Sequence, residues 1–377
     1  MTTAPGSPWP APPVVEPRSV DGGPRAARGA GRTRVVGVDV ARGLAVLGMF
    51  AAHMWPRVDL DERVFDGRSA ILFATLAGVS LGLMSGGAAP TPRGRRARVV
   101  GSIAIRAGIL IALGLLLQAW NGYVLVILPY YGVMFLLLLV VLFAPPGVLL
   151  VIAAVVAVGA PALATLVPQD AYGDSSLPGA AGVATDALLV GAYPALVWLP
   201  FLLVGLVAAR SDLRSRGTQL VMLGAGTAAA LVGYTVRFLP GAAAVPAFDP
   251  ADHEGMPAEI VGSGGVAIAV IGLLLLVTSP DRAWGRGVAT ALRPLSATGA
   301  QPLTVYSAHL LLTAPLFFAY RTEGGSYGLP LWQLAVAVVA TLTYAVLWQR
   351  FVGRGPLERA VGRLSSPWSR GPRAVTD

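Results

Sequence analysis

Long apolar runs separated by short polar segments dominate the chain from residue 35 to residue 350. Each run is about twenty residues long, the length that an α-helix needs to cross the hydrocarbon core of a bilayer. The alternation of runs and polar breaks predicts ten membrane-spanning helices, at residues 35–55, 67–86, 99–119, 126–144, 147–167, 190–209, 217–238, 262–279, 296–319 and 330–350. The pattern therefore predicts an all-α, polytopic membrane protein.

The composition agrees with this prediction and removes several kinds of chemistry. Hydrophobic residues make up 55% of the chain and charged residues 12%, about half the charged fraction of soluble domains. The chain has no cysteine, which excludes disulfides, thiolate metal sites and cysteine nucleophiles. His253, in the loop after the seventh run, has no second histidine at metal-ligand spacing, so we predict no metal site.

The two ends of the chain differ from its middle. Residues 1–33 are rich in Pro, Gly and Ala and lack apolar periodicity, which predicts a disordered tail. Residues 354–377 are basic and are expected to form a second tail. Between them, residues 34–353 form the predicted membrane domain. Arginines precede its first run and no small-residue cleavage site follows, so we expect that run to stay as a helix.

The basic charge of the chain predicts its orientation. All 28 basic residues are arginine, and the net charge is +9. With the N-terminus in the cytoplasm, 21 arginines lie on the cytoplasmic side and five on the outer side. The positive-inside rule therefore predicts that both termini are cytoplasmic, in agreement with an even number of spans. The charge is explained by topology, so nucleic-acid binding is not expected. The arginine bias, with abundant Ala, Gly and Pro, indicates a GC-rich bacterial genome, and for a bacterial multi-span protein we expect the plasma membrane.

Few ionisable residues lie inside the predicted spans, and these are the first candidates for function because burying them in a membrane is costly. The first span contains Asp39, Arg42 and His53. Arg42 and His53 are eleven residues apart, which places them on one helical face, separated by a rise of about 16 Å. Asp39 precedes Arg42 by three residues, a spacing that predicts an ion pair within the helix.

The third span adds cations without adding an acid. Arg98 and Arg106 share a face that runs from the cytoplasmic surface into the membrane. With Arg42, they leave an excess of positive charge near the inner leaflet. Such an excess suits the phosphate of an anionic ligand that enters from the cytoplasm. Arginines at this depth also reach lipid headgroups without any bound ligand, so both interpretations stand.

Two histidines are candidates for proton transfer. His53 ends the first span at the outer surface, where an imidazole can act as a base near pH 7 or anchor the helix beside Trp55. His309 lies in the middle of the ninth span, three residues after Tyr306. It suits either a site or an interhelical hydrogen bond. The polar outer loops at 168–190 and 239–261 are candidate walls of a substrate site, or passive connections.

Glycines within the spans predict close packing of helices rather than nucleotide binding. No strand precedes the glycine cluster that opens the eighth span, which excludes a dinucleotide-binding fingerprint. We therefore expect small-residue helix contacts at Gly43, Gly48, Gly224, Gly226, Gly233, Gly262, Gly264 and Gly265.

Four motifs resemble one family of membrane enzymes. The segment from Arg34 to Ala45, with its Asp-x-x-Arg-Gly core, resembles the opening signature of the transmembrane acyltransferases typified by heparan-α-glucosaminide N-acetyltransferase. The residues 66–80, 128–133 and 306–309 resemble later helices of that family. The closing Gly-Pro-Leu-Glu-Arg at 355–359 resembles a related bacterial family of multi-span proteins without assigned activity.

The resemblance implies transfer of an acetyl group from cytoplasmic acetyl-CoA to an amine or hydroxyl of an acceptor outside the cytoplasm, such as a sugar. It implies that the nucleotide lies near Arg42 and Arg106, together with Asp39, Arg98 and Tyr306. His53 would be the general base or form an acetyl-histidine, and His309 is a further candidate. Asp66 would orient His53 or the acceptor, and Arg68 would stabilise the oxyanion. A homodimer is also implied.

One departure from the family concerns the base. The eukaryotic enzyme of that family has asparagine at the position of His53, and its proposed catalytic histidine lies in the following outer loop. Residues 56–66 of this chain contain no histidine, so the role passes to His53 or the chemistry differs. The competing hypothesis is a transporter that exports a small anionic metabolite without covalent chemistry, and a structural or regulatory subunit is a third.

Overall fold

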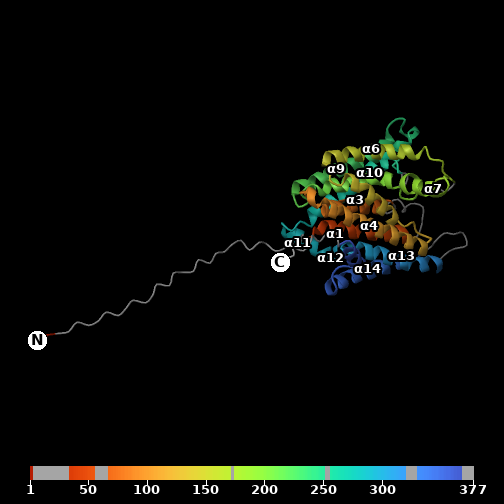
Figure 1. The fold of residues 1–377 in the computed structure, drawn as a ribbon. Coiled ribbons are helices and arrows are strands. Elements are labelled where there is room, and N and C mark those ends of the chain that lie inside the picture. Colours follow the sequence, from red (N-terminus) through yellow and green to blue (C-terminus); the bar gives the residue numbers. More distant parts are fainter. Residues whose placement is uncertain (3–33, 56–66, 171–173, 251–254, 320–328, 367–377) are drawn as a thin grey trace, which may run out of the picture. The chain divides into compact units, whose positions relative to one another are not determined.

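The structure is a computed structural model that describes residues 1–2, 34–55, 67–170, 174–250, 255–319 and 329–366 (Figure 1). The chain divides into two compact units, Met1–Arg34 and Val35–Asp377. The predicted tail at 1–33 lies outside the described residues except for its first two. All helices of the described residues belong to the second unit, and none of these residues forms a β-strand. The fourteen α-helices are α1 Val36–Met54, α3 Arg68–Met84, α4 Arg93–Trp120, α5 Leu128–Val141, α6 Pro146–Ala164, α7 Gly179–Thr185, α8 Ala195–Ala209, α9 Arg216–Thr235, α10 Pro257–Val277, α11 Ala283–Ala291, α12 Arg293–Gly299, α13 Pro302–Ala319, α14 Leu331–Phe351 and α15 Pro356–Leu364.

The helices confirm a multi-pass membrane protein. Among the described residues, seven helices are long and apolar enough to cross a bilayer, and an eighth is obtained if the bent pair Gly179–Val190 and Ala195–Ala209 forms one span. Two further apolar helices, α3 and α5, have only 17 and 14 residues. Every one of the ten predicted ranges therefore contains a helix, while a crossing by ten of them stays a prediction.

The span predicted at 296–319 is present but begins later, at Pro302, because the residues before it end a separate helix. Helix α12 ends at Gly299 and α13 begins at Pro302. Proline fits the first turn of a helix but cannot continue one, because it has no N–H to donate. The start of α13 is also capped by a distant carboxylate: Glu358 accepts hydrogen bonds from the backbone N–H groups of Leu303 and Thr304, at 2.8 and 3.0 Å.

The segments expected to be loops contain additional helical structure. The predicted loop at 168–190 contains α7 and a π-helical turn, Asp186–Val190, and the chain bends by 43° before α8 begins. Helix α10 begins at Pro257, five residues before the predicted start of its span. Helix α15 lies in the segment expected to be a tail, and it packs against α13 and α4.

Glycines let α1 lie against its neighbours at backbone distance, as predicted. A Cβ at Gly43 would collide with the carbonyl oxygen of Leu295 in α12, and one at Gly299 with the carbonyl oxygen of Asp39. A Cβ at Gly48 would collide with the hydroxyl of Ser69 in α3. Close contacts on both sides make α1 the most buried of the seven long apolar helices.

The glycine contacts between α9 and α10 are confirmed with one exception. Gly226 packs against Gly265, and Gly233 packs against Gly262. Gly224, by contrast, has no neighbouring atom within 4 Å of the position that a Cβ would occupy, so its predicted packing role is wrong.

The bundle has two chemically different ends. We call the end where α1 finishes and α8, α10 and α14 begin the His53 end, and the opposite end, where α1, α4 and α13 begin, the Arg42 end. At the Arg42 end the guanidinium of Arg210 is buried and joins three helices. It donates to the carbonyl oxygens of Gly87 and Leu142, at 3.0 and 2.6 Å, and to the hydroxyl of Ser85 at 3.0 Å. One arginine at the end of α8 therefore holds the ends of α3 and α5 beside it by hydrogen bonds.

Candidate functional site

A histidine pair lies at the His53 end, formed by two residues that are 256 positions apart in the sequence. The Nδ1 atom of His53 and the Nε2 atom of His309 are 2.9 Å apart, so one nitrogen donates a proton to the other. The two rings are nearly parallel, with centroids 5.2 Å apart. The structure thus brings together the two histidines that were candidates for proton transfer.

Packing fixes the orientation of this pair. The ring of Phe50, one turn before His53 on α1, stacks on His309 with a centroid distance of 4.0 Å. His309 is 4% exposed, whereas His53 is half-buried and lines a cavity. Because the bond to His309 uses Nδ1 of His53, proton exchange with a molecule in the cavity would go through Nε2.

The cavity beside His53 has a volume of about 910 Å³. It lies where α1, α6 and α13 end and where α8, α10 and α14 begin, and the turn between α4 and α5 closes one side. Residues from both predicted wall loops, 168–190 and 239–261, reach it. The lining residues of the described chain include Trp55, Tyr123, Leu125, Pro161, Thr165, Gln169, Asp174, Val190, Tyr193, Trp198, Met256 and Phe317.

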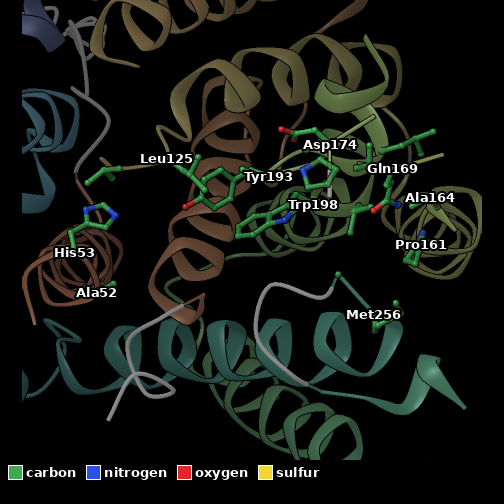
Figure 2. Close-up of a pocket in the computed structure, with 18 of the residues that line it drawn as sticks. Ala52, His53, Leu125, Pro161, Ala164, Gln169, Asp174, Tyr193, Trp198 and Met256 are labelled. Carbon is green, nitrogen blue, oxygen red and sulfur yellow. Dashed lines mark hydrogen bonds between the residues drawn. The ribbon is translucent and has the colours of Figure 1, made fainter. Parts of the chain in front are cut away.

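Aromatic rings form much of the cavity wall. Figure 2 shows Tyr193 and Trp198 between His53 on one side and Gln169 on the other. The ring of Tyr193 meets that of Trp198 edge to face at 5.2 Å, and Trp198 meets Phe201 in the same way at 5.5 Å. This continuous aromatic packing holds the wall rigid.

The charge of the cavity is carried by one acid. Asp174 is the single carboxylate among the described lining residues, and none of them is an arginine. The Asp174 side chain is exposed, and partial desolvation raises the pKa of its carboxyl above the ordinary value, as do the like charges of Asp186 and Asp170. The described part of the lining therefore offers a carboxylate, which suits neutral or cationic molecules.

At the opposite end of α1, Arg42 makes the ion pair that its spacing predicted. Its Nη1 lies 2.8 Å from Oδ1 of Asp39 and donates to the carbonyl oxygen of Gly299 at 2.9 Å. Its Nη2 donates to the hydroxyl of Ser80 at 2.9 Å. Arg42 thus joins α1, α3 and α12, and its hydrogen-bonding groups are largely occupied by the protein itself.

The other residues expected at the nucleotide side have different surroundings. Arg98 and Arg106 both lie on α4, as predicted. Arg98 is half-buried, and the Nε atom of Arg106 is buried without a hydrogen-bond partner among the described residues. Tyr306 is 2% exposed, and its hydroxyl accepts a bond from the backbone N–H of Ile127 at 3.4 Å.

The two residues expected to assist His53 are not seen to contact it. Asp66 lies outside the described residues. Arg68 begins α3, and its Nε donates to the hydroxyl of Tyr234 at 3.1 Å, which in turn lies 2.7 Å from the hydroxyl of Ser263. Arg68 is not among the lining residues of the cavity, so this interaction links α3 to α9 and α10.

Several residues of the site carried no recognisable signal in the sequence. Tyr193 and Trp198 lie in apolar surroundings that are typical of any span. Asp174 was one acid of a polar loop, and Ser80 and Gly299 were an ordinary serine and glycine. Their partners, His53 and Arg42, could be singled out because ionisable residues are rare in the spans. Comparison with protein-family models and with curated proteins finds no match for the chain.

Proposed function

We propose that this protein is a transmembrane acyltransferase that moves an acetyl or other acyl group from cytoplasmic acyl-CoA to an amine or hydroxyl of an acceptor in the cavity. In this proposal ten helices cross the plasma membrane, both termini are cytoplasmic, and the His53 end faces outward. Motifs that resemble the acyltransferase family lie on the helices that carry the histidine pair and on those that carry Arg42 and its partner Ser80.

The observation that carries the proposal is the histidine pair at the wall of the cavity. A base needs a proton acceptor that faces the substrate and a second group that stabilises its charged form. His53 lines the cavity, and its Nδ1 lies 2.9 Å from Nε2 of His309. When Nε2 of His53 takes a proton, the Nδ1–H group can donate to His309, which holds the imidazolium in place.

The proposed reaction balances without any further reagent. The amine or hydroxyl of the acceptor attacks the thioester carbonyl, and His53 takes the proton that the acceptor loses. The carbon–sulfur bond breaks, the new carbon–nitrogen or carbon–oxygen bond remains, and the CoA thiolate receives the proton from His53. In the two-step route His53 itself attacks first, and the acceptor then removes the acetyl group from its imidazole.

The two ends of the bundle suit the two substrates. Arginines gather at the Arg42 end, where the phosphates of a nucleotide would be held. Arg42 is itself bonded to Asp39, Ser80 and Gly299, which leaves Arg98 and Arg106 as the candidates for phosphate contact.

The cavity suits an acceptor of modest size. Its volume of about 910 Å³ is that of a small-molecule site. The aromatic wall, Gln169 and Asp174 would accommodate a sugar that is neutral or carries an amine, because they offer ring faces and acceptor oxygens.

Acyl transfer by reconstituted protein tests the proposal. Radiolabelled acetyl-CoA is supplied on the cytoplasmic side of proteoliposomes, with amino sugars and neutral sugars on the other side. We expect labelled acceptor with the wild type, loss of about a hundredfold or more with His53→Ala, and a smaller loss with His309→Gln. Equal rates for wild type and His53→Ala would refute the role of the pair. Movement of unmodified solute without acetyl-CoA would replace the enzyme by a transporter.

A further inference from the structure

Arg106 lies inside the bundle without a visible counter-charge among the described residues. Helix α4 carries five arginines and no aspartate or glutamate, and Arg106 is the one farthest from its start. Its Nε atom is buried and makes no hydrogen bond with the described residues. A buried guanidinium nitrogen without an acceptor is costly, so a group that supplies acceptor oxygens would stabilise it.

The charged residue that acts on Arg106 is a second cation. Arg354 lies in the turn between α14 and α15, and α15 packs against α4. The turn is held in place because the indole N–H of Trp348 donates to the carbonyl oxygen of Arg354 at 3.1 Å. Gly353, with φ of 94°, supplies a left-handed backbone conformation that other residues rarely adopt. The position of Arg354 is therefore built into the fold, although its side chain is exposed.

The nearest acidic residue in the sequence is already used elsewhere. Glu358 is the single carboxylate between residues 329 and 366. Its Oε1 accepts the N–H groups of Leu303 and Thr304, and its Oε2 accepts the hydroxyl of Thr304. Helix α13 has no acid either. Arg354 thus precedes a helix that packs against α4, the helix of Arg106, and the carboxylate of this region caps α13.

In the proposed topology, helix α15 lies at the cytoplasmic surface of the membrane. It is a short amphipathic helix that follows the membrane-length helix α14. Its Arg359 lies over the ring of Trp348, at 5.6 Å from the centroid, and its Leu364 is exposed. An amphipathic helix with arginines and an exposed leucine is typical of the membrane interface, and basic pockets between helices at this level bind phosphate groups.

We propose that Arg106 and Arg354 form a binding site for a phosphate group at the Arg42 end, between α4 and the turn that joins α14 to α15. Guanidinium groups suit phosphate because two N–H groups can point at two of its oxygens. The phosphate comes either from the headgroup of an anionic phospholipid or from a soluble nucleotide such as CoA. The site rests on its own residues, and it would serve the proposed acyl transfer only if the phosphate belongs to the nucleotide.

Binding measurements on the full chain test the site and identify the source. Wild type, Arg354→Gln, Arg106→Gln and the control Arg363→Gln are purified in detergent. Arg363 is exposed on α15 and its replacement removes the same charge. In the first arm, native mass spectrometry counts retained phosphatidylglycerol and phosphatidylcholine. In the second arm, thermal unfolding compares CoA with pantetheine, which lacks the nucleotide phosphates.

We expect one arm to respond in wild type and in Arg363→Gln, with binding reduced about fivefold or more in Arg354→Gln and Arg106→Gln. The response should also fall as salt is added. Loss in the first arm alone assigns a lipid headgroup, and loss in the second alone assigns the nucleotide. The site is refuted if all four proteins bind alike, or if Arg363→Gln loses as much as Arg354→Gln. A lipid result would leave the acyl-transfer proposal to the His53 assay, so the two proposals fail separately.

Discussion

A single guanidinium, that of Arg42, joins three helices at one end of the bundle. It contacts Asp39 of its own helix, Ser80 of α3 and Gly299 of α12. Removing it would take away the guanidinium that lies 2.8 Å from Asp39 in a partly buried pair, and breaking an ion pair from one side costs up to about 3–5 kcal/mol where the pair is fully buried. We expect Arg42→Ala to lower the thermal unfolding midpoint strongly, whereas Arg93→Ala, at an exposed position on α4, should not.

A double variant separates the energy of the Asp39–Arg42 interaction from the other contacts of the two residues. Asp39→Ala with Arg42→Ala should be less destabilised than the sum of the single variants, because no uncompensated charge remains. Additive effects would mean that the Asp39–Arg42 bond is not what stabilises this end. Binding of CoA by the folded Arg42→Lys protein would further show that the guanidinium acts in structure and not as a phosphate ligand.

Asp174 gives a prediction about pH. Its pKa in the folded protein is raised by partial desolvation and by Asp186 and Asp170, so folding favours the protonated carboxyl. The stability that this group contributes is therefore fully present below the ordinary value of 3.8 and is lost as the pH rises through the folded-state pKa. We expect Asp174→Asn to raise the unfolding midpoint at pH 7, with the advantage vanishing as the pH is lowered. A lower midpoint for Asp174→Asn at pH 7 would contradict this account.

At the residue scale, the sequence predicts interactions along one helix better than those across the bundle. The spacing of Asp39 and Arg42 predicts their ion pair, because residues three apart lie on one helical face. The bonds of Arg42 to Gly299 and of His53 to His309 cross 257 and 256 positions. No periodicity encodes such a contact, so rarity of charge identifies the candidates but not their partners.

At the scale of elements, the crossing of α1 and α12 depends on glycine. A Cβ at Gly43 would collide with the backbone of α12 at Leu295, which cannot move like a side chain. We expect Gly43→Ala to destabilise the protein by about 1–3 kcal/mol through overpacking. The matched control is Gly224→Ala on α9, where nothing lies within 4 Å. It should stabilise the helix by up to about 1 kcal/mol. Equal thermal midpoints for the two variants would refute the close contact.

The start of α13 depends on a carboxylate from the far end of the chain. Glu358 accepts three hydrogen bonds there, from the N–H groups of Leu303 and Thr304 and from the hydroxyl of Thr304. Glu358→Ala should cost about 1–3 kcal/mol, because bonds to a charged acceptor are strong. Glu358→Gln should fall between the wild type and Glu358→Ala. If the midpoint of Glu358→Ala equals that of Arg363→Ala, the cap contributes nothing.

This cap accounts for the late start of the span predicted at 296–319, which begins at Pro302. Residues 296–301 are small or polar, and Pro302 alone permits either a kink or a new helix. The choice between them is made by Glu358, 55 residues from Leu303. The ranges of α1, α6 and α14 were predicted closely because each is a single apolar run whose ends are set by nearby polar residues or prolines.

At the scale of the whole molecule, the cavity and the arginines lie at opposite ends. Helices α3, α5 and α8 have 17, 14 and 15 residues. A rise of 1.5 Å per residue makes them roughly 21–26 Å long, shorter than a hydrocarbon core of about 30 Å. Short helices beside longer ones leave space at one end of a bundle, and the cavity lies where α5 and α8 begin. The proposed outward cavity would thus reach below the membrane surface.

The proposed ten-span topology can be tested on the natural background, because the chain has no cysteine. Single cysteines replace Ala88 before α4, Gly122 between α4 and α5, and Gly147 at the start of α6, and all three positions are exposed. Ten crossings with a cytoplasmic N-terminus place residues 88 and 147 inside and residue 122 outside. A membrane-impermeant maleimide added to intact cells should therefore label Gly122→Cys alone, and lysis should expose the other two. If the bundle were inverted, with its N-terminus outside, Ala88→Cys and Gly147→Cys would be labelled in intact cells and Gly122→Cys would be protected. That labelling pattern would place the histidine pair and its cavity on the cytoplasmic side of the membrane. The proposed transfer to an acceptor outside the cytoplasm would then fail.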